Sequence, residues 1–164
     1  MRISSILLAL TTLLATQCRQ APDTRLYLVR HAEKAQDGTD DPDLSEDGLL
    51  RAARLADMLD SADVTRLYAT DWKRTRSTLA PLAARTGMEI RIYDWRDTAS
   101  VAAMLKDCAG HTAVICGHSN STPRLANFIL QEEKYEPLSE SEYGKLFRLT
   151  LAGSRVREAT ILDY

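Results

Sequence analysis

The stretch Leu26-Tyr27-Leu28-Val29-Arg30-His31-Ala32-Glu33-Lys34 holds the pattern that decides the fold. Its first four residues are a short apolar run bounded by polar residues, which is typical of a buried strand in a parallel sheet. Arg30 and His31 follow directly, and ligands of open α/β sheets bind at the carboxyl ends of such strands. The pattern predicts that Arg30 and His31 belong to a binding or catalytic site. The alternative is a strand that simply ends in polar residues.

The composition describes one ordinary globular domain. A chain of 164 residues with a hydrophobic fraction of 45% and a charged fraction of 27% is long enough to bury a core. The formal net charge is −2 and the sequence has no dense cluster of lysine and arginine, so we expect no nucleic-acid partner. The three cysteines are too scattered for zinc-type pairing, and no metal ligand set is predicted.

The amino-terminal segment predicts export. Arg2 supplies a positive charge, and Ile3 to Ala15 is an apolar stretch interrupted only by small hydroxyl residues, the layout of a secretory signal peptide. It is too short for a good membrane span. Cys18 follows where bacterial lipoproteins carry a lipid-modified cysteine, so membrane attachment through Cys18 and plain secretion are both open. We expect a periplasmic protein or a lipoprotein of the outer membrane or cell surface.

These signals divide the chain into three parts. Residues 1–17 form the predicted signal peptide, residues 18–24 a short linker that starts at the first mature residue, and residues 25–164 the domain. Cys108 and Cys116 would then face an oxidising compartment, where a disulfide between them is permitted. The sequence does not predict an oligomeric state.

Alternating strand and helix patterns fill the rest of the chain. Apolar runs predict strands, and residues at helical spacing predict helices between them. The order predicts a three-layer α/β/α fold with a mostly parallel central sheet and a carboxy-terminal β-hairpin. The expected strands are 26–29, 65–69, 89–93, 112–116, 146–151 and 156–162, and the expected helices start near residues 45, 72, 97 and 121.

Several helix boundaries have local signals. Ser45 is the expected N-cap of the first helix, and a stripe of Leu49, Ala52, Ala53, Ala56 and Leu59 is its expected core face. Asp71 is the expected N-cap of the second helix and Gly87 its terminator. Pro81 should kink or shorten that helix. Charged residues from 132 to 142 predict a mobile connection.

Two histidines and two arginines converge in this topology. His31 and His118 each follow a buried strand, and parallel strands end at the same edge of a sheet. Arg74 falls in the first turn of the helix that starts at that edge, beside Arg30. Guanidinium groups match phosphate oxygens bidentately, and the helix start after His118 supplies free N–H groups. The set predicts a site for an anion with several oxygens.

Each of these residues also has a structural interpretation. His118 could be a structural strand-end histidine, and Arg74 could be the ion-pair partner of Asp71 or Asp97. His111 has no motif around it and sits at the opposite end of its strand. A zinc site at the two histidines is possible by ligand type, but the neighbouring arginines would repel a dication.

Three ordered motifs resemble the histidine phosphatase superfamily, which has the phosphoglycerate-mutase-like fold. They are Val29-Arg30-His31-Ala32-Glu33-Lys34, Ala69-Thr70-Asp71-Trp72-Lys73-Arg74-Thr75 with Thr78, and Val114-Ile115-Cys116-Gly117-His118-Ser119-Asn120. The stretches 44–48 and 142–147 are similar to small exported members. Ala32 stands where the family usually has glycine, which leaves the nucleophile in place.

The resemblance implies a covalent mechanism. An imidazole nitrogen of His31 attacks phosphorus, and the phosphohistidine is then hydrolysed by water. Arg30, Arg74 and His118 hold the phosphoryl group, and Ser119 and Asn120 add hydrogen bonds. The resemblance implies no metal and no cofactor, because the arginines supply the positive charge.

The proton donor for the leaving group is less well defined. Many family members use a glutamate in a longer insertion after the second arginine, but this stretch is short here and offers Asp97 and Asp94 instead. Asp97 is our candidate, with a helix cap as the equal alternative, and Glu33 and Asp37 are further candidates. Members without the insertion are similar to the compact bacterial phosphohistidine phosphatase, whose good leaving group needs little acid help.

The function expected from these residues is phosphomonoester hydrolysis. The substrate is a small phosphorylated compound or a phosphoprotein, including a phosphohistidine protein. The alternative is a surface lipoprotein that binds a phosphorylated ligand without turnover. Acidic residues near the motifs argue against a highly anionic substrate.

Overall fold

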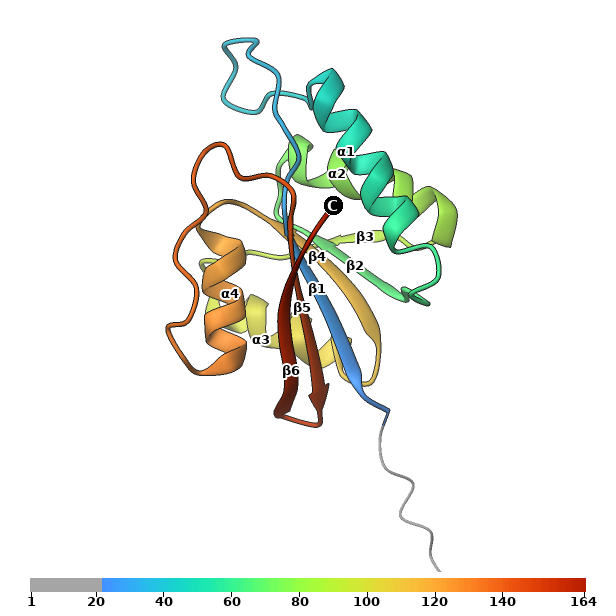
Figure 1. Ribbon diagram of the computed structural model, residues 1–164, viewed down its shortest axis with the longest axis vertical. Helices are drawn as coiled ribbons and strands as arrows, with labels where there is room; N and C mark the ends of the chain where they lie inside the picture. Colours follow the sequence, from blue (N-terminus) through green and yellow to red (C-terminus); the bar gives the residue numbers. More distant parts are fainter. Residues whose placement is uncertain (1–21) are drawn as a thin grey trace, which may run out of the picture.

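A computed structural model describes residues 22–164 (Figure 1). The predicted signal peptide and the predicted lipid site at Cys18 lie outside the described residues. Within residues 22–164, no helix is long and apolar enough to cross a membrane.

The order of elements matches the predicted order. Strands and helices alternate four times, and two further strands close the chain (Figure 1). The elements are β1 (Thr24–Arg30), α1 (Glu46–Met58), β2 (Arg66–Ala69), α2 (Lys73–Thr86), β3 (Ile90–Ile92), α3 (Thr98–Cys108), β4 (Thr112–Gly117), α4 (Ser121–Leu130), β5 (Lys145–Ala152) and β6 (Arg155–Asp163).

One six-stranded sheet runs through the domain in the order β3-β2-β4-β1-β5-β6. The first four strands of this order are parallel, and β5 and β6 form the expected antiparallel hairpin. β1 lies between β4 and β5, and Arg30 pairs in register with Gly117. This register puts the residues after both strands, His31 and His118, side by side.

Successive side chains of β1 point to opposite faces of the sheet and belong to two core layers. Leu26 and Leu28 pack with residues of α3 and α4, whereas Val29 packs with residues of α1 and α2. A strand that is covered on both faces reads as a continuous apolar run, as in this sequence. The sheet is therefore the middle of three layers, with two helices on each face (Figure 1).

The helix α1 begins as predicted and buries most of its predicted face. The Ser45 side chain accepts a hydrogen bond from the Gly48 N–H, which confirms the cap. Leu49 was expected in the core but is 56% exposed, and Leu55 is fully buried. Ala52, Ala56 and Leu59 of the predicted stripe are buried. Leu55 takes the place of Leu49 on the core face, which preserves the helical spacing.

The start of α2 corrects a prediction. Asp71 does not cap the helix, and its carboxylate pairs with Arg76 instead. The carboxylate of Asp41, in a distant loop, accepts from the Lys73 N–H at 3.0 and 3.1 Å. Gly87 ends the helix with a φ of 68°, as expected, but Pro81 does not shorten it.

The two core cysteines lie on opposite sides of the sheet. Cys108 packs with the α3 and α4 layer and Cys116 with the α1 and α2 layer. Both are buried free thiols, so the permitted disulfide between them does not form.

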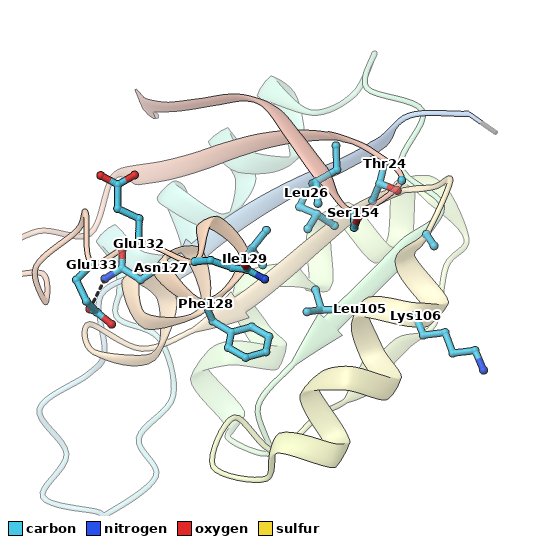
Figure 2. Close-up of a pocket in the computed structure, with 14 residues that line it drawn as sticks. Thr24, Leu26, Leu105, Lys106, Asn127, Phe128, Ile129, Glu132, Glu133 and Ser154 are labelled. Atoms are coloured by element: carbon cyan, nitrogen blue, oxygen red, sulfur yellow. Dashed lines mark hydrogen bonds between the residues drawn. The ribbon is translucent and has the colours of Figure 1, made fainter. Parts of the chain in front are cut away.

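A groove of about 590 Å³ opens at the amino end of β1 (Figure 2). Thr24 and Leu26 of β1, Leu105 and Lys106 of α3 and Ile129 of α4 line it. His31 follows the other end of β1, so this groove is separate from the predicted site.

Candidate active site

A second cavity, of about 320 Å³, lies at the carboxyl ends of β1 and β4. It contains both histidines and both arginines that the sequence predicted together. Its lining residues are Arg30, His31, Lys34, Trp72, Arg74, Trp95, Arg96, His118, Ser119, Asn120 and Glu140.

His31 is held as a neutral imidazole with one free nitrogen. The residue is only 5% exposed, and its Nδ1 lies 2.8 Å from the Ala32 carbonyl oxygen. A carbonyl can only accept, so Nδ1 carries the proton and Nε2 carries the lone pair. Burial is the main cause that lowers the pKa of His31 from 6.5 to about 3, so the ring is neutral at pH 7. Nε2 is thus a competent nucleophile.

His118 lies next to His31. The ring centroids are 5.4 Å apart, and Nε2 of His118 is 2.9 Å from the Thr70 hydroxyl. Burial, followed by the charge of Arg74, lowers the pKa of His118 to about 4. Both imidazoles are therefore neutral at pH 7, and the positive charge in the pocket comes from its arginine and lysine side chains.

Buried hydrogen bonds fix the backbone around His31. The His31 N–H donates to the Gly117 carbonyl at 2.9 Å, which ties the end of β1 to the end of β4. The Ala32 N–H donates to the Thr78 hydroxyl at 2.9 Å, and that hydroxyl donates to the Arg74 carbonyl at 2.7 Å. Thr78 thus links the segment after His31 to α2, which carries Arg74.

Arg30 is buried, and its guanidinium is hydrogen-bonded to the loop of residues 139–142. Its Nη1 donates to the carbonyls of Ser139, Glu140 and Glu142 at 2.7, 3.2 and 3.1 Å, and its Nη2 donates to the Glu140 carboxylate at 3.2 Å. Its guanidinium carbon lies 4.0 Å from the centroid of the Tyr143 ring. The connection from 132 to 142 was expected to be mobile, but its last part is tied to the site.

Arg74 has a partner that the sequence did not suggest. Its Nη1 lies 3.5 Å from an Asp41 oxygen, and its guanidinium lies over the Trp72 ring at 4.3 Å. The alternatives Asp71 and Asp97 do not pair with it. Asp41 therefore orients Arg74 as well as capping the helix that carries it.

The start of α4 supplies the remaining predicted groups. Ser119 and Asn120 line the pocket directly after His118. The His118 N–H donates to the Ser121 hydroxyl at 2.8 Å. A Cβ on Gly117 would lie 2.7 Å from that same hydroxyl oxygen, so only glycine fits this turn without a shift.

The acid candidates from the sequence lie outside the pocket lining. The Asp97 side chain caps α3 by accepting from the Ala99 N–H at 2.9 Å, which is the alternative we had left open. Asp94 accepts from the Arg96 N–H, and Asp37 accepts from Thr39. Glu33 forms a bidentate pair with Arg51, whose hydrogen bonds lower the pKa of the Glu33 carboxyl although burial opposes them.

Glu140 is a pocket carboxylate that no sequence motif predicts. It lines the pocket and pairs with Arg30, although its side chain is 82% exposed. Four cationic side chains line the same cavity, namely those of Arg30, Lys34, Arg74 and Arg96. The expectation of acidic surroundings is therefore wrong at the pocket itself, because the acidic residues nearby point elsewhere.

Comparison with known families fits this arrangement. Residues 26–95 match the histidine phosphatase superfamily, branch 1. The match takes in the motifs at His31 and Arg74 and ends before the one at His118. A comparison with curated proteins finds no match.

Solved structures with the same fold cover most of the chain. A mycobacterial glucosyl-3-phosphoglycerate phosphatase has a TM-score of 0.65 at 16% identity, with 87% of this chain and 98% of that chain covered. The protein histidine phosphatase SixA, complexed with tungstate, has a TM-score of 0.63 at 15% identity, with 84% and 94% covered. A SixA structure from Nakamurella multipartitia has a TM-score of 0.59 at 22% identity, with 86% and 97% covered. At these identities the likeness establishes the fold.

Proposed function

We propose that the protein is a phosphomonoester hydrolase that works through a phosphohistidine intermediate on His31. The observation that carries the proposal is the neutral, fixed imidazole of His31 beside two arginines. Its Nδ1–H is held by the Ala32 carbonyl, so the Nε2 lone pair is available at neutral pH. The family match and the phosphatases among the solved structures support the same reaction class.

The proposed reaction has two steps. In the first, Nε2 of His31 forms a bond to phosphorus, and the phosphorus–oxygen bond to the leaving group breaks, with the electron pair leaving on that oxygen. The leaving oxygen then takes a proton from solvent. In the second step, a water oxygen attacks phosphorus and the phosphorus–nitrogen bond breaks. His31 is regenerated, and inorganic phosphate and one proton are released.

Arginine charge stabilises the transition state in this proposal. Arg30 and Arg74 offset the negative charge on the equatorial oxygens, and neutral His118 and the start of α4 provide further hydrogen-bonding groups. The reaction as proposed requires no metal, since the guanidinium groups supply the positive charge.

The lining of the pocket favours substrates with a good leaving group. Its one carboxylate among the described residues, Glu140, is paired with Arg30, so the lining offers no unpaired carboxyl as a proton donor. A phenol or an imidazole leaves without strong acid help, whereas a simple alcohol does not. A phosphohistidine protein is therefore a second candidate substrate, and two of the solved structures are named for SixA.

The test combines turnover with trapping of the intermediate. Phenyl phosphate is incubated with the wild type and with the His31→Ala variant, and phosphorylated peptides are sought by mass spectrometry without acid. We expect turnover and a label on His31 in the wild type, and neither in the variant. His111→Ala is the matched control, because His111 lies at the other end of β4. Phosphate binding by the wild type without turnover would instead support the non-catalytic ligand-binding alternative.

We propose in addition that the protein is exported and lipid-anchored at Cys18. The support is the sequence pattern of residues 1–18. Labelling cells with a radioactive lipid precursor tests this directly, with Cys18→Ala as the unlabelled control. A secreted, unlabelled wild type would favour the plain signal peptide.

A further inference from the structure

The cationic surface continues beyond the phosphate pocket toward α4. Trp95 and Arg96 line the phosphate pocket, and both also line a smaller neighbouring cavity of about 90 Å³. Arg124, from the first turns of α4, and Phe128 complete its polar and apolar sides. Two guanidinium groups therefore border one small cavity that shares Trp95 and Arg96 with the phosphate pocket.

The two guanidinium groups flank the same indole ring. The guanidinium carbon of Arg96 lies 4.9 Å from the Trp95 ring centroid, and that of Arg124 lies 5.7 Å from it. Neither side chain forms a hydrogen bond or an ion pair with any of residues 22–164, whereas Arg30 and Arg74 have carboxylate neighbours. Two positive charges therefore lie close to one indole ring, and no carboxylate of residues 22–164 pairs with either of them.

One of these two charges, that of Arg96, belongs to the phosphate pocket itself. Arg96 lines the phosphate pocket together with His31 and His118, and its charge is among the causes that lower the pKa of His118, after burial and Arg74. An anionic group bound by Arg96 would therefore lie next to a phosphoryl group on His31, within one substrate molecule.

A third cavity beside Trp95 carries acidic side chains. This groove of about 430 Å³ is lined by Glu133 and Glu136 and also by Arg124. An acidic polypeptide extending along this groove would meet two carboxylates. These carboxylates disfavour an anion in the groove, whereas no carboxylate of residues 22–164 lines the small cavity that Arg96 and Arg124 share.

We infer that the substrate is a small organic phosphate whose leaving group carries a second anionic group, bound by Arg96 and Arg124 across the face of Trp95. The inference rests on the proposed hydrolysis at His31 and specifies its substrate class. The phosphoryl group occupies the pocket with Arg30 and Arg74, and the carbon skeleton of the leaving group contacts the indole.

Phosphonates separate this inference from catalysis, because their carbon–phosphorus bond resists hydrolysis. Calorimetry measures the binding of phenylphosphonate and of 3- and 4-carboxyphenylphosphonate to the wild type and to Arg96→Gln and Arg124→Gln. We expect the wild type to prefer at least one carboxylated compound about five- to tenfold, the range for a partly exposed charge-assisted contact, and each variant to lose that preference. Arg155→Gln removes the same charge from the distant hairpin and should keep it.

The outcomes distinguish the two proposals. Equal binding of all three phosphonates by the wild type overturns the inference, as does a carboxylate preference that survives in both variants. Turnover of phenyl phosphate by the wild type is measured in parallel and reports on the proposed function alone. If the wild type hydrolyses phenyl phosphate but binds all three phosphonates equally, the proposed function is supported and the inference of a second anionic group on the substrate is refuted.

Discussion

The buried histidines make the stability of the protein depend on pH, and replacing His31 measures the effect. In the unfolded chain its imidazole has the ordinary pKa of 6.5, whereas burial lowers it to about 3 in the folded protein. At pH 5 the unfolded form binds about 0.97 protons at this site and the folded form about 0.01, so stability falls by about 1.3 kcal/mol per pH unit. This contribution is fully present above pH 6.5 and is lost as the pH falls toward 3. Between pH 7.5 and 5.0 the loss is about 2 kcal/mol.

Urea unfolding at the two pH values tests this estimate. The other titrating groups are the same in wild type and His31→Asn, so the variant should lose about 2 kcal/mol less stability on acidification. Asparagine keeps an amide that can donate to the Ala32 carbonyl, which limits other changes. His118→Asn should show an effect of the same sign, since burial also lowers its pKa, to about 4. Equal acid sensitivity of wild type and His31→Asn would refute the reasoning.

Two further changes test the contacts around the site. Thr78→Val leaves the buried Ala32 N–H without its acceptor, and we expect a loss of about 1–3 kcal/mol in urea unfolding, well above that of Thr86→Val, whose hydroxyl donates within its own helix. Glu140→Gln removes the charge that a phosphate must displace from Arg30. We expect inorganic phosphate to bind about two- to fivefold more tightly by calorimetry, because an exposed ion pair is worth about 0.2–1 kcal/mol, and weaker binding would contradict this role.

The sequence predicted the fold because its patterns are local. The apolar run from Leu26 to Val29 marks a strand that is covered on both faces, and the Ser45 cap and the Gly87 terminator are read from single residues. The convergence of His31 and His118 needed only the rule that parallel strands end together, and the register of Arg30 with Gly117 bears it out.

The rest of the site depends on contacts between segments that are far apart in the chain. Asp41 caps α2 and approaches Arg74 from a loop more than 30 residues away, so the nearer Asp71 was the wrong choice. The carbonyls that hold Arg30 belong to backbone, which carries no residue signature, and the charges around them suggested a solvated loop. The sequence around Asp97 fits both a helix N-cap and a proton donor. Only the hydrogen bond that its carboxylate accepts from the Ala99 N–H identifies it as the cap.

The position of β1 has a consequence for when the candidate site can form. The strand that carries Arg30 and leads to His31 is the first of the sheet to be synthesised, yet it lies between β4 and β5. The hydrogen bonds of β1 can therefore form on both sides only after β4 and β5 have been synthesised. The bond from the His31 N–H likewise requires the Gly117 carbonyl. Such long-range pairing forms late and slowly. A nascent or truncated chain that ends before residue 139 lacks both β5 and the loop that holds Arg30, so the surroundings of His31 are assembled only after β5 has been made.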